Sequence, residues 1–226
     1  MGRNVCDLVD APRVPKQELQ VLDVEQAQHF LEAAKSDPLE ALYIAALTTG
    51  MREGELLALK WKDIDFQQGT IQVKRTIARV RGQGFKVLEP KTPKSRRSIH
   101  LAPMTLEALK HHRIRQRQQR LIAGAAWEEH DWVFCNSLGK PMERGNMVKR
   151  SFRRVLTRAG LPQIRFHDLR HSCATLLLSM GVHPKIVQER LGHSQIAVTL
   201  DTYSHVLPSL QEEASHRLDT LLVQRQ

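Results

Sequence analysis

The chain has 226 residues, 41% hydrophobic and 26% charged, which is typical of a soluble globular protein of one large or two small domains and argues against disorder. Its 34 lysines and arginines against 24 acidic residues give a net charge of +10, which favours a polyanionic partner. No apolar run approaches the roughly 18 residues of a membrane span, and neither a signal peptide nor a basic lipid anchor is recognisable, so we expect a cytoplasmic protein that binds nucleic acid rather than membrane.

The three cysteines argue against a disulfide framework and against a zinc site. Cys6, Cys135 and Cys173 are odd in number, far apart and without metal-ligand spacing. We expect reduced thiols, with Cys173 as a core residue.

The first half of the chain predicts helices followed by a small sheet. Residues 1–20 are polar and contain two prolines, so they read as a linker. Asp23 and Gln26 form a capping pair before an apolar helical pattern, and a central helix runs from Leu39 to Thr49, where Gly50 ends it. Period-two alternation then predicts antiparallel strands around 71–75, 85–88 and 98–101, with turns at 67–69 and 82–84.

The second half is mainly helical. A long helix starts at Pro103 and continues to about Leu121, a short strand and turn follow within 130–142, and residues 146–161 form an amphipathic helix with five exposed cations. Further helices are predicted from about His167 to Gly181, from Pro184 to Gly192, from Ser194 to Tyr203, and after Pro208.

The stretch from Arg165 to His205 carries more titratable chemistry than a plain core needs. His167, Arg170 and His171 lie on one side of a helix start, and the apolar residues behind them can bury the rest of that helix. A glycine stop delivers His193 to the end of the next helix. Tyr203 lies ten residues further on, among polar residues, whereas the other tyrosine, Tyr43, lies in an apolar helix and is predicted to be core.

Five segments in order, TGMREGELLAL, PKTPKSRRSIHL, HDLRHS, LGHS and DTYSH, resemble the signature motifs of the tyrosine recombinase (phage integrase) family. The resemblance covers the chain from about Val21 to His205. It implies a mainly α fold with a small antiparallel β-sheet. It also implies a catalytic domain that cuts and rejoins double-stranded DNA through a covalent 3'-phosphotyrosyl intermediate, without metal or nucleotide cofactor.

The chemistry of phosphodiester cleavage suits these residue types. Planar guanidiniums, as on Arg52 and Arg170, match the charge that develops on the two non-bridging oxygens. A phenol titrates near pKa ~10, so Tyr203 needs nearby cations or a base to act as nucleophile, and His167 is the candidate base. His193 is a candidate donor to phosphate oxygen.

The resemblance adds two roles. It implies that Lys91, in a sheet loop, protonates the departing 5' oxygen, although Lys86 and Lys94 lie close by. Glu55 matches the family's acidic position and is expected to orient the cationic cluster.

Five further cations are predicted to contact phosphates, because the sheet loops flank the expected site: Arg79, Arg81, Lys94, Arg96 and Arg97. The basic run from Lys110 to Arg120 is equally consistent with a DNA contact and with a solvated helix face.

Other interpretations remain open at this point. Arg52 could be a helix cap, Lys91 a solvated lysine and His193 a cation at a helix C-terminus. Asp168 is expected to cap a helix start, and His171 and His205 to pack around the site.

Three other functions also fit parts of the pattern. HDLRH has the i, i+4 histidine spacing of zinc hydrolases, with His193 or Glu189 as a third ligand, but an arginine would lie beside the metal. Residues 48–61 could form the helix-turn-helix of a non-catalytic regulator. A type IB topoisomerase shares much of the chemistry.

Members of the resembled family usually carry an N-terminal core-binding domain, and here only about twenty linker-like residues precede the catalytic region, 21–226. We therefore expect a catalytic fragment or a natural half-clamp. The resemblance also implies a homo-oligomer, a tetramer, on DNA and leaves room for accessory DNA-bending proteins.

Overall fold

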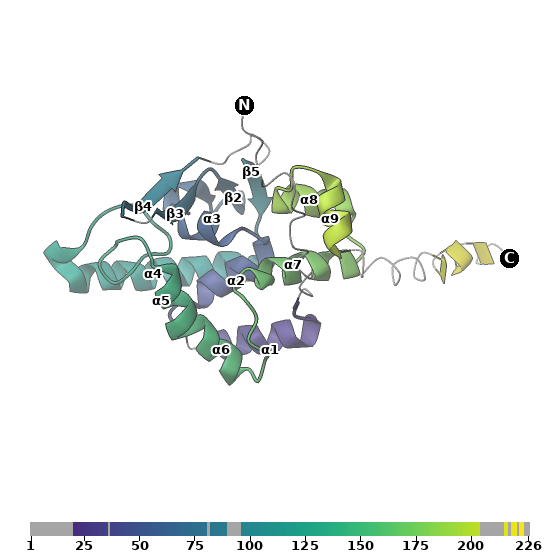
Figure 1. Cartoon of the computed structure of the whole chain (residues 1–226), viewed down its shortest axis with the longest axis horizontal. Helices are drawn as coiled ribbons and strands as arrows, with labels where there is room; N and C mark the ends of the chain where they lie inside the picture. The colour runs from purple at the N-terminus through teal and green to yellow at the C-terminus, as the bar shows by residue number, and fades with distance from the viewer. Residues whose placement is uncertain are drawn as a thin grey trace, which may run out of the picture.

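Helix α2, Glu40–Thr49, is the centre of the protein in this computed structural model (Figure 1). The structure describes residues 20–35, 37–80, 82–89 and 96–203, and the short stretches 215–216, 218–220 and 222–223. Of residues 201–203 it describes the backbone only. Eight of the ten residues of α2 are buried, and a helix that is apolar all round belongs in a core. As predicted, Gly50 ends it in the left-handed conformation, at φ +63°.

An aromatic cluster fixes the helices around α2. The rings of Phe30, Tyr43, Phe152 and Phe166 pack edge-on or tilted, with centroids 5.4–6.4 Å apart. Tyr43 is fully buried and its hydroxyl bonds Ser151, which confirms the prediction that it is a core residue. Burial raises the pKa of its phenol well above the ordinary range.

Helices form most of the described chain. Helix α1, Val24–Ala34, begins with the predicted capping box of Asp23 and Gln26. The other helices are α3 (Glu53–Leu57), η2 (Trp61–Asp63), α4 (Pro103–Ala123), η4 (Gly124–Ala126), α5 (Arg144–Met147), η5 (Val148–Phe152), α6 (Arg153–Arg158), α7 (Asp168–Ser179), α8 (Pro184–Leu191) and α9 (Ile196–Tyr203).

The strands form two antiparallel sheets rather than the single one expected. Strands β1 (Ile64–Asp65), β2 (Thr70–Val73) and β5 (Arg97–His100) make one, with Ile71 opposite Ile99, and β3 (Thr76–Val80) and β4 (Gly84–Leu88) make the other. The sheets part at Lys74 and Arg75, where Arg75 forms an ion pair with the buried carboxylate of Asp63. The mainly α fold with small antiparallel sheets is confirmed.

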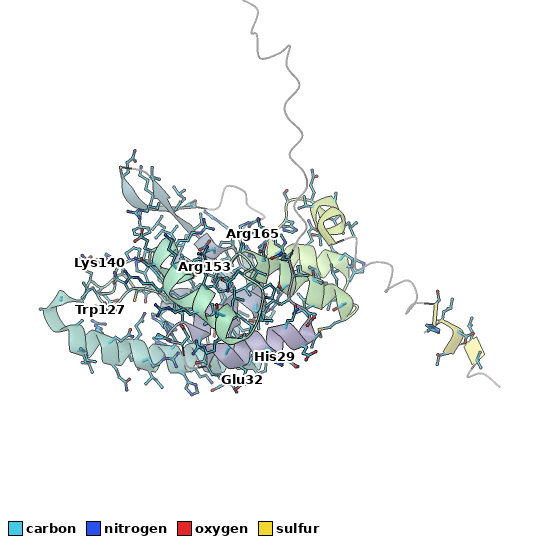
Figure 2. The ribbon with its side chains drawn as sticks, turned by 60° about the horizontal axis from the view of Figure 1, so that its bottom comes forward. His29, Glu32, Trp127, Lys140, Arg153 and Arg165 are labelled. Atoms are coloured by element: carbon cyan, nitrogen blue, oxygen red, sulfur yellow. The ribbon has the colours of Figure 1, made fainter. Side chains whose placement is uncertain are left out.

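Two predicted elements differ in detail. The amphipathic helix at 146–161 is built from α5, one π-helical turn and α6, and its predicted cations are exposed; Arg153 lies on the face turned to the viewer in Figure 2. The strand expected within 130–142 consists of isolated bridges, Lys60 with Trp132 and Cys135 with Pro141. The start of the helix predicted after Pro208 lies outside the described residues.

Helices α7 and α8 lie at one end of α2, and α9 packs on α8. Helix α7 packs on α2, and Ala174, Leu178, Val187 and Leu191 form a separate small core between α7 and α8. Helix α8 also contacts β5, so the end of α8 lies beside both the sheet and α2 (Figure 1). Among the described helices, each one is too short or too polar to cross a membrane.

Candidate active site

Arg52 lies at the start of α3, close to the C-terminus of α2. Its backbone N–H donates to Glu55 Oε2 at 2.9 Å and its Nη1 donates to Glu55 Oε1 at 2.9 Å. Its Nη2 donates to the carbonyl oxygen of Gly192 at 3.2 Å, while its side chain stays 40% exposed. Arg52 is thus held on one side and open to solvent on the other.

Glu55 receives a second guanidinium, from Arg97 on β5. Its side chain is 4% exposed, and Arg97 Nη2 donates to its Oε2 at 2.8 Å. Burial raises the pKa of the Glu55 carboxyl, but the hydrogen bonds and charges of Arg97 and Arg52 outweigh burial and hold the pKa below its ordinary value. Glu55 is therefore a fixed anion between two cations.

Arg170 projects from the first turn of α7 into the protein. Its side chain is buried, and Nη1 donates to the carbonyl oxygens of Gly50 at 2.7 Å and Leu191 at 2.9 Å. Both acceptors lie at helix C-termini, where the last carbonyls have no partner within the helix and the helix dipole is negative. The ends of α2 and α8 thus hold the guanidinium.

Three consecutive carbonyls at the end of α8 bind three arginines. Arg97 Nε donates to Arg190 O at 2.6 Å, Arg170 to Leu191 O at 2.9 Å, and Arg52 to Gly192 O at 3.2 Å. These arginines come from β5, α7 and the start of α3. The end of α8 therefore brings together side chains that are up to 118 residues apart in the sequence.

His193 follows this helix end directly. Its Nδ1 bonds Thr199 Oγ1 of α9 at 2.9 Å, and its backbone carbonyl accepts from Gln188 Nε2 at 3.0 Å. Burial, followed by the charges of Arg170 and Arg52, lowers the pKa of His193 to about 4. A neutral imidazole does not fit the alternative of a cation at a helix C-terminus.

His167 and His171 meet at the start of α7. Their rings pack edge to face with centroids 5.0 Å apart. Burial and the nearby charges of Arg170 and Arg165 lower the pKa of His167, and burial and His167 lower that of His171 to about 4. The expectation that Asp168 caps the helix is wrong: it is the first residue of α7, the N-cap is His167 without a side-chain cap bond, and the Asp168 side chain accepts the backbone N–H of Arg165 at 2.8 Å.

The zinc and regulator alternatives gain no support from this geometry. Among the described residues, His167 and His171 belong to no cluster of three or more potential metal ligands, and Arg170 lies beside them. Nearly all of α2 is buried and α3 has only five residues, so these two helices do not present a recognition helix to DNA.

The comparisons with known proteins agree with the order of motifs. The profile of the phage integrase family matches residues 20–209. The chain belongs to the phage integrase family. It is 37% identical over 240 residues to the tyrosine recombinase XerC-like protein of Caldanaerobacter subterraneus subsp. tengcongensis, covering 99% of this chain and 61% of that protein.

Two further relatives of the family are similar. The ICEBs1 integrase of Bacillus subtilis is 32% identical, with 98% of this chain and 60% of that protein covered. The Tn1549 transposon integrase in complex with circular intermediate DNA superposes with a TM-score of 0.73 at 25% identity, covering 96% of this chain and 71% of that one. The chain spans about 60% of the length of these curated relatives.

The remaining residues of the family motifs are only partly described. Tyr203 is the last residue of α9, and the structure describes its backbone alone. Lys91, Arg81, Lys94 and His205 lie outside the described residues. Thr199, which bonds His193, lies one helical turn before Tyr203, so α9 is anchored to the site close to the family's tyrosine position.

The predicted phosphate contacts lie in two different environments. Arg79 and Arg96 have side chains 64% and 59% exposed and pair with Glu143 and Glu89 at the surface. Arg97, in contrast, is 6% exposed and bound to Glu55. We correct the expectation for Arg97: strand β5 turns it inward, so it is a partner of Glu55 rather than an exposed cation.

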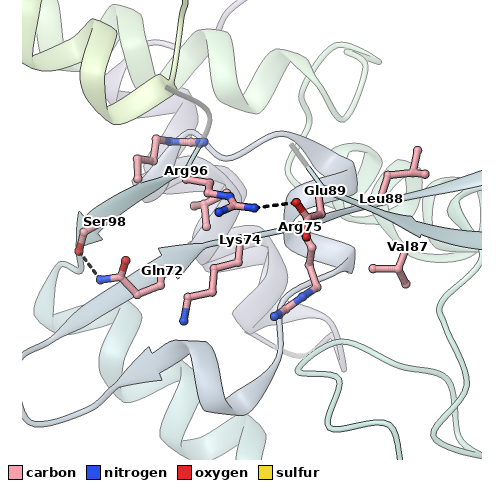
Figure 3. A pocket seen from close by; sticks show the side chains of 10 residues that line it. Gln72, Lys74, Arg75, Val87, Leu88, Glu89, Arg96 and Ser98 are labelled. Atoms are coloured by element: carbon pink, nitrogen blue, oxygen red, sulfur yellow. Dashed lines mark hydrogen bonds and ion pairs between the residues drawn. The ribbon is translucent and has the colours of Figure 1, made fainter. Parts of the chain in front are cut away.

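An open groove of about 680 Å³ runs beside these residues, between the two sheets (Figure 3). Arg96 reaches across to Glu89, and Lys74 and Arg75 line the same groove. Four of the residues that line the groove are cationic, and one of these, Lys74, was not among the predicted contacts.

Sequence reasoning missed the structural roles of Arg97 and Arg190. Arg190 Nη2 donates to the carbonyl oxygens of Thr48 at 2.8 Å and His100 at 3.2 Å, so it ties α8 to α2 and β5. A signal for Arg97 was present: it lies two residues before Ile99, and alternate residues of a strand share a face.

Proposed function

We propose that this chain is the catalytic part of a site-specific recombinase that cleaves and rejoins double-stranded DNA. The observation that carries the proposal is the meeting of Arg52, Arg170 and His193 at the C-terminus of α8, with His167 nearby. Guanidiniums fixed before the substrate arrives stabilise developing phosphate charge without reorganisation. The DNA complexes known for the Tn1549 integrase support DNA as the substrate.

In the proposed first step, the Tyr203 hydroxyl attacks the scissile phosphorus and loses its proton to His167. The bond from phosphorus to the 5' oxygen breaks, and Lys91 gives a proton to that oxygen. The products are a 3'-phosphotyrosyl linkage and a free 5'-hydroxyl. His167 suits the base role because its lowered pKa keeps the imidazole neutral near pH 7.

In the proposed second step, a 5'-hydroxyl of the same or another strand gives its proton to Lys91 and attacks the phosphotyrosine. The bond from phosphorus to the tyrosine oxygen breaks, and His167 returns its proton to Tyr203. The ester energy is kept in the linkage, so resealing needs no ATP. Arg52 and Arg170 serve both steps, since the same two non-bridging oxygens carry the charge. His193 donates to one of them through the ring nitrogen that does not bond Thr199.

We further propose how the chain engages its partners. Arg79, Arg81, Lys94 and Arg96, with Lys74 in the groove, would contact phosphates. Exchange between two sites would involve a tetramer on DNA and, in some settings, DNA-bending proteins. We keep 1–20 as a linker and 21–226 as the catalytic domain, acting in the cytoplasm.

A suicide-substrate assay tests this function. The wild-type chain is incubated at low salt with a pool of nicked duplexes of random core sequence, and covalent adducts are recovered under denaturing conditions and sequenced. We expect an adduct that survives a chelator and maps to the peptide containing Tyr203. Exchange between two recovered sites distinguishes a recombinase from a type IB topoisomerase.

The matched variants are Tyr203→Phe and Tyr43→Phe. Tyr203→Phe should bind DNA and form no adduct, whereas Tyr43→Phe removes only the hydroxyl that bonds Ser151 in the core and should keep cleavage. Continued nicking by Tyr203→Phe would show that another residue is the nucleophile.

A further inference from the structure

Arg97 is almost completely enclosed, yet it carries one of the most extensively bonded side chains near the site. Its Nη1 and Nη2 donate to the two oxygens of Glu55 at 3.2 and 2.8 Å, and its Nε donates to the carbonyl oxygen of Arg190 at 2.6 Å. This is the paired geometry in which a guanidinium matches a carboxylate. A lysine has no equivalent fork.

Glu55 connects Arg97 to Arg52. The carboxylate accepts four hydrogen bonds: from the Arg52 backbone N–H, Arg52 Nη1, and Arg97 Nη1 and Nη2. A carboxylate offers about four lone-pair sites, so all of them are in use. The orientation of Arg52 therefore depends on a carboxylate that Arg97 holds in place.

The backbone before His193 also rests on Arg97. A Cβ placed on Gly192 would lie 2.9 Å from Arg97 Nη1 and 3.2 Å from its Cδ, and Gly192 has φ +70°. The glycine allows the chain to turn and to approach the guanidinium closely. One side chain thus sets the position of Arg52 through Glu55, and of His193 through the carbonyl of Arg190 and the Gly192 turn.

We propose that Arg97 is a positioning residue for DNA cleavage, which holds Arg52 and the His193 turn in their relative places without touching DNA. This inference rests on the proposed function and deepens it. The adjacent Arg96 is the natural contrast, because it is 59% exposed and reaches across the open groove to Glu89 (Figure 3). The two neighbours are expected to affect different steps.

The test compares Arg97→Gln and Arg97→Lys with Arg96→Gln and Arg96→Lys. Single-turnover cleavage of a nicked duplex recovered with the wild-type chain is measured over a range of DNA concentrations. We expect Arg97→Gln to lower the maximal rate by about 100-fold, as a misplacement of about 1 Å does, with half-saturating DNA unchanged within twofold. Arg96→Gln should act mainly on binding and raise half-saturating DNA several-fold.

A double-mutant cycle with Glu55→Gln tests the route of the effect. Because Arg97 acts on Arg52 through Glu55 and on the His193 turn without it, the double variant should lose less than the product of the two single losses, since neighbours in one network are not additive. Rate losses that multiply would overturn the inference. So would an Arg97→Gln profile like that of Arg96→Gln, which would make Arg97 a DNA contact.

A measurement without DNA separates this inference from the proposed function. NMR titration should show a higher pKa for His193 in Arg97→Gln than in Arg96→Gln. Burial lowers this pKa most, and the charges of Arg170, Arg52, His171 and then Arg97 lower it further. An unchanged pKa of His193 in Arg97→Gln would overturn the inference, whereas a wild-type chain that forms no adduct would overturn the proposed function. If Arg97→Gln does not fold, Arg97→Lys keeps the charge and should give an intermediate loss of maximal rate.

Discussion

Arg170 Nη1 donates to the carbonyl oxygen of Gly50 at 2.7 Å across a separation of 120 residues. The same nitrogen donates to Leu191 O at 2.9 Å, so one buried guanidinium joins the C-termini of α2 and α8. Arg52 lies two residues after Gly50, and His193 lies two residues after Leu191. The contact therefore fixes the distance between the two segments that carry the other site residues.

The first prediction concerns the glycine under this contact. Gly50→Ala should destabilise the protein strongly, because Gly50 has φ +63° and a Cβ would lie 2.5 Å from Leu191 Cδ2. The left-handed conformation costs about 1–2 kcal/mol and overpacking about 1–3 kcal/mol more. Chemical denaturation should show the sum.

Gly160→Ala is the matched control for that measurement. Gly160 also has a positive φ, +68°, but a Cβ there meets nothing within 4 Å. The free energy of unfolding of Gly160→Ala should fall only by the cost of the left-handed conformation, about 1–2 kcal/mol. Equal losses for the two variants would mean that the α2–α8 contact is not tight.

The second prediction is a loss of stability in mild acid. Burial and neighbouring charges lower the pKa of His171 and His193 from 6.5 to about 4. Below pH 6.5 the unfolded chain binds protons that the folded chain does not, so the free energy of unfolding should fall as pH falls from 6.5 towards 4. Glu55, whose pKa is lowered, adds a separate loss only below pH 4.5.

Urea denaturation at intervals between pH 7.5 and pH 4 measures this dependence. His171→Gln and His193→Gln should each flatten the fall between pH 6.5 and 4, because each removes one proton-binding group from the unfolded chain. A stability that is level across this range in the wild-type chain would show that the imidazoles are not held neutral.

The sequence predicted the helices well because their signals are local. The Asp23 capping box, the glycine stops at Gly50 and Gly192, and Pro184 at the first turn of α8 each act within a few residues. The division into two sheets was missed. At the point of division Arg75 pairs with buried Asp63, and periodicity carries no information about that partner.

The sequence predicts which residues of the candidate site belong together, but not the hydrogen-bond network that joins them. Motif order pointed to Arg52, Arg170 and His193, which the structure brings together at the end of α8. That the last three carbonyls of this segment hold three arginines is a long-range relationship that leaves no local pattern. Arg97 shows the difference most clearly: its position beside the sheet loops predicts a phosphate contact, whereas its strand register turns it inward onto Glu55.

The third prediction concerns salt dependence of DNA binding. Lys74→Gln and Arg96→Gln should each reduce the slope of log affinity against log salt by about one, since each would remove one phosphate contact. Fluorescence anisotropy with a duplex of about 30 bp, at salt concentrations from about 50 to about 200 mM, measures this slope. Arg117→Gln, exposed on α4, is the control and should leave the slope unchanged.

Binding by the wild-type chain alone should be weak. The phosphate contacts that we propose for it are few, namely Arg79, Arg81, Lys94, Arg96 and Lys74, so the electrostatic part of the binding should be small. Nanomolar affinity at physiological salt would contradict this expectation, and equal slopes for the Arg117 and Arg96 variants would remove the groove from the DNA path.

The last prediction links α9 to His193. Thr199 is fully buried, and its hydroxyl bonds His193 Nδ1 at 2.9 Å. Thr199→Val keeps the shape but removes the hydroxyl, so the imidazole nitrogen loses its partner and α9 loses its bond to the site, at a cost of about 1–3 kcal/mol. Because Tyr203 lies one turn further along α9, we expect cleavage to slow about tenfold or more while DNA binding is kept.

Thr199→Ser tests whether the hydroxyl itself is responsible. It keeps the hydrogen bond and loses only a methyl group, so its cleavage rate should stay close to that of the wild-type chain. If Thr199→Ser and Thr199→Val slow cleavage equally, packing of the methyl group holds α9. If neither variant changes the rate, the position of the tyrosine helix is set by contacts other than the one to His193.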